Sequence, residues 1–311
     1  MLLAIGTYIG NGVDDRSITG IGFQPDLVLV KGNTSTVGDS DAKWRSNSMV
    51  GDLSGSWGTV AGGGANVIQS LEIDGFQIGT SIGVNEDTKT YYYFAFRDNG
   101  DGDFATGTYE GNATDNRAIT VGFQPTLVVV RNDSVERAVY KTDQHTGENT
   151  TYFMSNVADI VTNAIQSLNV NGFTVGTRTT VNDNLDTHDW FAFKDVTNEF
   201  NVVKYTGNGA NDRSITGVGF QPEVAATKES STSSGVFRTT SHVGDSSIIV
   251  SAAGVNAVDC IQAFEADGMQ VGTNGAVNEN LINYYALFWK VPASGGAVAQ
   301  VHSNLLLMGT G

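Results

Sequence analysis

Short apolar runs recur along the chain, each directly after a glycine-rich phrase that ends in proline. They lie at residues 27–31, 127–131 and 224–228. An apolar run of this length between turn residues is typical of a strand buried on both faces. The preceding proline lacks an N–H group and therefore belongs before the strand rather than inside it. The pattern predicts three buried strands.

A second pattern predicts hairpins. An Asp-Gly or Asn-Gly pair lies at 74–75, 171–172 and 267–268, each time between two runs rich in β-branched and aromatic residues. Such pairs supply the two positive-φ positions of a type I′ turn. We expect a hairpin with this turn at all three places.

Three aromatic runs, at residues 91–97, 190–194 and 284–290, predict further strands. Alternation along a strand places only every second ring on one face, so some of Tyr91, Tyr92 and Tyr93 are expected to face outward. Outward rings would suit a glycan or a partner, whereas the simpler interpretation is packing between sheets.

These patterns belong to one repeat. The phrase that begins Arg16-Ser-Ile-Thr recurs from Arg117 and Arg213, and the hairpin glycine recurs at 75, 172 and 268, a spacing of 97 and then 96 residues. A repeat of this length is large enough to be a domain with its own core. We count seven or eight short strands in each copy and predict an all-β chain of tandem antiparallel β-sandwiches.

The predicted modules are residues 1–98, 99–196 and 197–291. The joints between them are short, so neighbouring modules should touch, and three of them could mimic a trimer. Residues 292–311 form a C-terminal tail that is expected to pack on the third module or to dock on a partner. Its apolar residues are Leu305, Leu306, Leu307 and Met308.

Composition and net charge exclude some classes of binding partner. The 311 residues are 40% hydrophobic and carry a formal net charge of −16. Such a chain repels phosphate backbones and anionic lipid, so neither nucleic acid nor a membrane is an expected partner. The first residues lack a basic region, and their apolar run is too short for a signal peptide. The single cysteine, Cys260, excludes an intramolecular disulfide and is expected to be a buried, inert thiol.

The most regular charges are Arg16, Arg117 and Arg213. A guanidinium group holds carboxylates and carbonyls in a fixed fork. Each arginine either binds a ligand or partner, or ties the glycine turn of its module to a neighbouring strand. Trp44 and Trp57 are further candidates for a ligand surface, although only the first module has tryptophan in its variable stretch.

No pattern indicates catalysis, a metal or a cofactor. Glu72 and Asp74 lie two residues apart, as in sandwich glucanases, but the second copy has asparagine at both places and the hairpin explains the aspartate. The acidic stretch 98–103 lacks the ligand spacing of an EF-hand loop. The four histidines are scattered. We therefore expect a non-enzymatic protein.

The complete pattern resembles a repeat of bacteriophage virion proteins, often tail fibre or structural proteins. It combines Ile-Thr-Gly-x-Gly-Phe-Gln-Pro, Asp-Gly-Phe-x-x-Gly, Val-Asn and a closing aromatic-Lys strand. The resemblance covers about 290 of the 311 residues and implies modules of the jelly-roll or concanavalin type. The closing strands end Phe-Arg97, Phe-Lys194 and Trp-Lys290, so only the third keeps the Trp-Lys ending of the repeat.

The resemblance implies a virion location after synthesis in the bacterial cytoplasm, with major capsid or tail proteins as partners and self-association as a further option. We expect a head decoration or tail-surface component that acts through protein–protein contacts. The alternative is a host-glycan-binding adhesin on a tail or head fibre.

Overall fold

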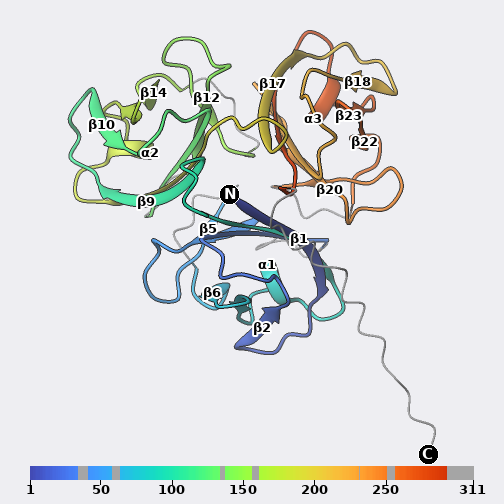
Figure 1. Cartoon of the computed structure of the whole chain (residues 1–311), viewed down its shortest axis with the longest axis horizontal. Helices are drawn as coiled ribbons and strands as arrows, with labels where there is room; N and C mark the ends of the chain where they lie inside the picture. Colours follow the sequence, from blue (N-terminus) through green and yellow to red (C-terminus); the bar gives the residue numbers. More distant parts are fainter. Residues whose placement is uncertain are drawn as a thin grey trace, which may run out of the picture.

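The computed structural model describes residues 1–33, 41–57, 64–133, 137–155, 161–230, 232–250 and 256–292. Within them each copy of the repeat forms eight strands and one single-turn helix. Figure 1 shows the three modules as three lobes around a common centre, the first in blue, the second in green and the third in orange. The predicted all-β fold, a β-sandwich repeated three times, is confirmed.

The elements of the first module are β1 (Leu2–Ile9), β2 (Arg16–Thr19), β3 (Leu27–Gly32), β4 (Lys43–Ser46), β5 (Gly55–Ser56), β6 (Ile68–Glu72), β7 (Gly75–Ile78), α1 (Ile82–Asn85) and β8 (Thr90–Arg97). Those of the second are β9 (Phe104–Glu110), β10 (Arg117–Thr120), β11 (Leu127–Asn132), β12 (Val139–Thr142), β13 (Thr151–Tyr152), β14 (Ile165–Asn169), β15 (Gly172–Val175), α2 (Thr179–Asn182) and β16 (Thr187–Phe193). Those of the third are β17 (Phe200–Thr206), β18 (Arg213–Ile215), β19 (Val224–Glu229), β20 (Val236–Thr239), β21 (Ile248–Ile249), β22 (Ile261–Glu265), β23 (Gly268–Val271), α3 (Gly275–Asn278) and β24 (Asn283–Trp289).

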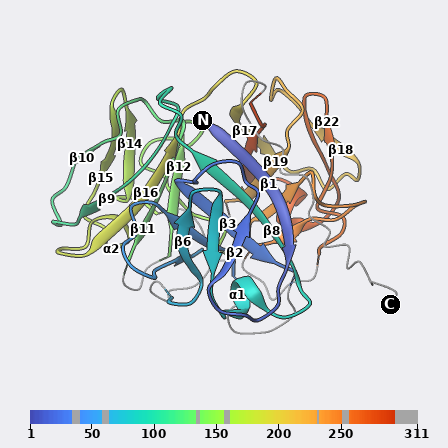
Figure 2. The same ribbon diagram turned by 60° about the horizontal axis from the view of Figure 1, so that its bottom comes forward.

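Each module contains two antiparallel sheets. In the first module the five-stranded sheet has the order β1-β8-β3-β4-β5 and the three-stranded sheet has the order β2-β7-β6, and the other modules repeat both orders. In Figure 2, where the first module comes forward, β1 and β8 run side by side, as their register from Leu2↔Arg97 to Ile9↔Thr90 requires.

The predicted hairpins are present, but the predicted turn type is wrong. Glu72 pairs with Gly75, so the loop residues are Ile73 and Asp74, and neither has the positive φ of a type I′ turn. The glycine follows the loop with φ +155°, and a Cβ there would lie 1.9 Å from the carbonyl oxygen of Ile18. Close backbone approach to β2 therefore explains this glycine.

Two kinds of core hold the chain together. One lies inside each sandwich, where Val28 and Val30 of the five-stranded sheet pack with Phe76 and Ile78 of the three-stranded sheet. The other lies at the centre of the molecule and combines residues of all three modules. Because Leu27 and Leu29 of the same β3 strand belong to this central core, the strand is buried on both faces, as predicted.

Three equivalent rings meet at the centre. Phe96, Phe193 and Trp289 occupy the same position of the closing strand in the three modules. Their ring centroids lie 4.9 Å (Phe96–Phe193), 5.9 Å (Phe96–Trp289) and 5.6 Å (Phe193–Trp289) apart. Mutual contact of three equivalent side chains requires a closed, approximately threefold arrangement, so the modules do not form a linear array.

This arrangement corrects the expectation of outward rings on the closing strand. Tyr91, Tyr92 and Tyr93 are all buried. Tyr91 and Tyr93 lie inside the first sandwich, and Tyr92 lies in the central core. Alternation does place the rings on opposite faces, but the neighbouring modules cover the face that a single sandwich would leave open.

Candidate functional site

The modules contact one another in a cycle, and two of the three contacts use the same stacked pair. His145 of the second module stacks on Tyr285 of the third with ring centroids 3.8 Å apart. His242 of the third module stacks on Tyr92 of the first at 3.9 Å. At both interfaces a flat imidazole thus packs face to face on a flat phenol ring.

The contact between the first and second modules departs from this pattern. Met49 occupies the position of the two histidines, and each of the three residues follows the fourth strand of its five-stranded sheet in the same turn. Asp189 occupies the position of the two tyrosines, because it pairs with Arg131 as Tyr92 pairs with Lys31. Replacement of two rings by a thioether and a short carboxylate leaves the space between these modules unfilled.

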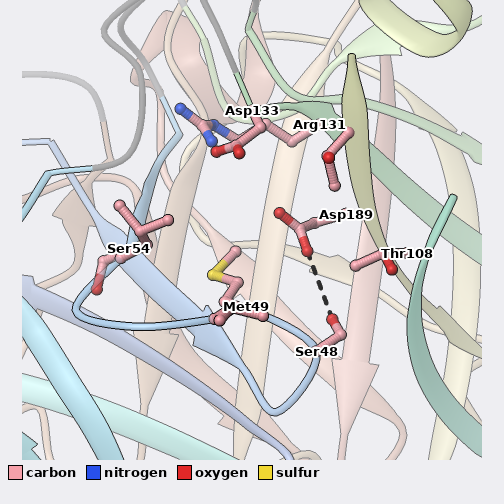
Figure 3. A pocket seen from close by; sticks show the side chains of 10 residues that line it. Ser48, Met49, Ser54, Thr108, Arg131, Asp133 and Asp189 are labelled. Carbon is pink, nitrogen blue, oxygen red and sulfur yellow. Dashed lines mark hydrogen bonds between the residues drawn. The ribbon is translucent and has the colours of Figure 1, made fainter. Parts of the chain in front are cut away.

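A pocket of about 290 Å³ lies at this place. Figure 3 shows side chains of both modules facing it. The first module supplies Ser48, Met49, Val50, Leu53 and Ser54, and the second supplies Thr108, Arg131, Asp133, Thr187 and Asp189.

Asp189 and Arg131 are the buried charges of the pocket, with exposed fractions of 4% and 1%. Burial and the charge of Asp133 raise the pKa of Asp189 to about 6, although Arg131 opposes the shift. Burial likewise lowers the pKa of the Arg131 guanidinium. The Ser48 hydroxyl approaches Oδ1 of Asp189 at 3.4 Å, a long hydrogen bond across the interface.

The wall contributed by the first module is held by Arg45 of β4. Its guanidinium donates to the carbonyl oxygens of Leu53, Gly51 (2.6 Å), Met49 (3.3 Å) and Ile68 (3.3 Å). Three of these four carbonyl groups belong to the loop 49–53, so one planar group restrains this loop. Hydrogen bonds within the first module therefore hold this wall of the pocket in place.

The predicted arginines have a structural role in all three modules. Arg16, Arg117 and Arg213 donate to the carbonyl oxygens of Ile9 (2.5 Å), Glu110 (2.5 Å) and Thr206 (2.7 Å). Each guanidinium also lies over a tyrosine ring of the first strand, 5.1 to 5.6 Å from its centroid. Each arginine thus ties its turn to the preceding strand, which was one of the two interpretations of the sequence.

The two predicted tryptophans are not part of an exposed surface. Trp44 and Trp57 are 1% and 2% exposed and belong to the central core. Trp44 packs against Phe191 at 5.4 Å and Trp57 against Phe153 at 4.6 Å, both across the interface with the second module. Their assignment to a ligand surface is wrong, because both side chains are buried at the contact with the second module.

A buried asparagine in each module has a role that the sequence did not reveal. The Asn182 amide donates to the carbonyl oxygens of Thr114 and Gly176, both at 2.9 Å, and its Oδ1 accepts the N–H of Asn112 at 2.9 Å. Asn85 and Asn278 make the same three contacts in their modules. The repeated Val-Asn pair was the available signal.

The acidic candidates are also engaged in the fold. The Asp74 carboxylate accepts the N–H groups of Gly20 (3.0 Å) and Gly22 (2.6 Å) and so closes the glycine turn. Asp103 forms a buried ion pair with the amino group of Met1 at 2.6 Å. Cys260 is buried, and its burial raises the pKa of the thiol to about 12.

Over the part of the chain that the structure describes, no group of three or more His, Cys, Asp or Glu side chains is placed to hold a metal ion. Among the same residues no helix has the length and apolar character needed to cross a membrane. The tail residues Leu305, Leu306, Leu307 and Met308 lie outside the described residues.

Comparison with known proteins finds one similarity. Residues 195–305, which cover the third module, match a family described as a domain of unknown function (DUF7483). No curated protein and no solved structure matches the chain.

Proposed function

We propose that the chain is a non-enzymatic structural protein of a bacteriophage particle, either a head decoration or a tail-surface component, that acts through contacts with other virion proteins. The observation that carries the proposal is the contact of Phe96, Phe193 and Trp289 at the centre. It makes one chain equivalent in outline to a compact trimer, a shape suited to a local threefold position of a protein lattice.

Exposed apolar side chains at equivalent points support a role in protein–protein contact. Ile73 and Val170 are 87% and 82% exposed at the hairpin loops of the first and second modules. Leu185 and Leu281 are likewise exposed, at equivalent turns of the second and third modules. Each of these exposed side chains recurs on two of the three modules, so two modules can offer a similar contact to a partner.

Mass spectrometry of purified particles, with the copy number measured against the major capsid protein, tests the proposal. Hundreds of copies would support a place on the capsid surface or along the tail. A handful, in multiples of three or six, would support a baseplate or fibre position. Absence of the chain from particles would overturn the proposal.

A further inference from the structure

Among the described residues, the pocket between the first and second modules lies where this interface lacks the stacked pair of the other two. The equivalent places at the other two interfaces are filled by the stacked pairs His145–Tyr285 and His242–Tyr92. Burying a carboxylate costs solvation free energy even beside a guanidinium group, so Met49 and Asp189 are a poor exchange for packing alone. A function for the cavity explains the departure better than stability does.

The lining combines hydrogen-bond acceptors, donors and a small apolar patch. Asp189 and Asp133 are acceptors, and Arg131 is a donor. Hydroxyl groups such as that of Thr108 can donate and accept hydrogen bonds. Met49 and Leu53 provide the apolar surface. A ligand that matches this set carries several hydroxyl groups on a compact frame with apolar C–H faces.

Charge balance favours a neutral ligand. Two carboxylates, Asp189 and Asp133, line the pocket with the Arg131 guanidinium, and the Arg45 guanidinium lies close enough to act on Asp189. Two negative and two positive groups create no strong net field for an ion. The volume of about 290 Å³ is at the lower end of small-molecule sites, roughly 300 Å³ and above, and suits one ring rather than an extended chain.

We propose that this pocket binds a neutral polyhydroxylated ligand, a single saccharide residue, with Asp189 and Arg131 as its principal polar contacts. The inference rests on the pocket alone and stands or falls independently of the virion role. It places any glycan binding at one module interface and not on the aromatic strands or the buried tryptophans.

The methionine methyl groups provide a direct test. The chain labelled with ¹³C-methyl methionine is titrated with glucose, galactose, mannose and N-acetylglucosamine, and with acetate and methylammonium as charged probes. We expect a saturable shift of the Met49 methyl resonance with at least one sugar. The methyl groups of Met154 and Met269, which are fully buried in the cores, should not move.

Three variants make the test specific. Asp189→Tyr inserts the ring found at the two equivalent positions and should abolish the shift. Asp189→Asn keeps the shape and should weaken sugar affinity about tenfold. Asp87→Asn, at an exposed carboxylate outside the pocket, should leave affinity unchanged. No Met49 shift with any sugar, a shift only with a charged probe, or equal affinity of the Asp189→Asn variant and the unmodified chain would overturn the proposal.

Discussion

Met49 and Asp189 line one pocket at the position where the other two module interfaces stack a histidine on a tyrosine. The pair opens a pocket of about 290 Å³ and leaves a carboxylate with 4% exposure inside the protein. The three interfaces of the chain can therefore be compared with one another. Two of them contain a stacked histidine and tyrosine, and the third contains a pocket instead.

Restoring the stacked pair should stabilise the fold. The double variant Met49→His with Asp189→Tyr removes a carboxylate whose pKa is about 6 when buried and fills the cavity. We expect the free energy of unfolding at pH 7 to rise by about 2 kcal/mol. Urea denaturation followed by tryptophan fluorescence measures the change.

The reverse exchange supplies the control for this prediction. Tyr92→Asp with His242→Met should open a second pocket and destabilise the chain by about 3 kcal/mol or more. If both double variants lower stability, the stacked pair cannot be exchanged between interfaces. The explanation that the pocket exists because the stacked pair is absent would then be wrong.

The stacked histidines predict loss of stability in acid. Burial lowers the pKa of His145 and His242 to about 3 from an ordinary value near 6.5. Between pH 6.5 and pH 3 both histidines are protonated in the unfolded chain but not in the folded chain. The free energy of unfolding should therefore fall as pH falls, by up to about 1.4 kcal/mol per pH unit for each histidine.

Asp189 acts with the opposite sign in part of this window. Its pKa is raised to about 6, so between pH 6 and its ordinary value near 3.8 the folded chain holds a proton that the unfolded chain releases. Urea midpoints measured from pH 7 to pH 4 should show a steeper acid loss for Asp189→Asn than for the unmodified chain. His145→Gln with His242→Gln should flatten the profile, and an unchanged profile would show that these histidines accept protons in the fold.

A single module should not fold alone. Removing its neighbours from residues 99–196 exposes the central-core face, including Tyr140, Phe153, Phe191 and Phe193. Exposure of so large an apolar surface favours aggregation. We expect this fragment to give poorly dispersed amide signals in NMR spectra and to associate, whereas the full chain gives one cooperative unfolding transition.

A more polar version of the same fragment tests whether the exposed apolar face is what prevents folding. Tyr140→Ser, Phe153→Ser and Phe191→Ser replace three large rings of the apolar face, and none of the three belongs to the sandwich core. Recovery of a folded monomer would show that the exposed face was the obstacle. A folded, monomeric parent fragment would contradict the dependence of each module on the shared core.

The buried asparagine should be essential to the loop that follows the first strand. Asn182→Ala leaves the N–H of Asn112 and the carbonyl oxygens of Thr114 and Gly176 without their partner. We expect a loss of about 3 kcal/mol in the free energy of unfolding, from chemical denaturation. Asn184→Ala, two residues further along and exposed, is the matched control and should change stability by less than about 0.5 kcal/mol.

The sequence by itself determined the repeat, the strands and the antiparallel sandwich. The apolar run 27–31, the hairpin pairs and the closing aromatic strands are local patterns, and a strand depends mainly on alternation and on the turns at its ends. For this reason the sequence predicted that β3 is buried on both faces. It also offered the hydrogen bond from Arg16 to the preceding strand as one of two interpretations.

Only the tertiary structure decided what covers the outer face of each five-stranded sheet. Alternation shows that Tyr92 and Tyr93 point to opposite faces, but not that a neighbouring module buries the first of them. Trp44 was misassigned for the same reason. Met49 and Asp189 stand 140 residues apart and carry no local signal, so the pocket between them exists only because three modules close around one core.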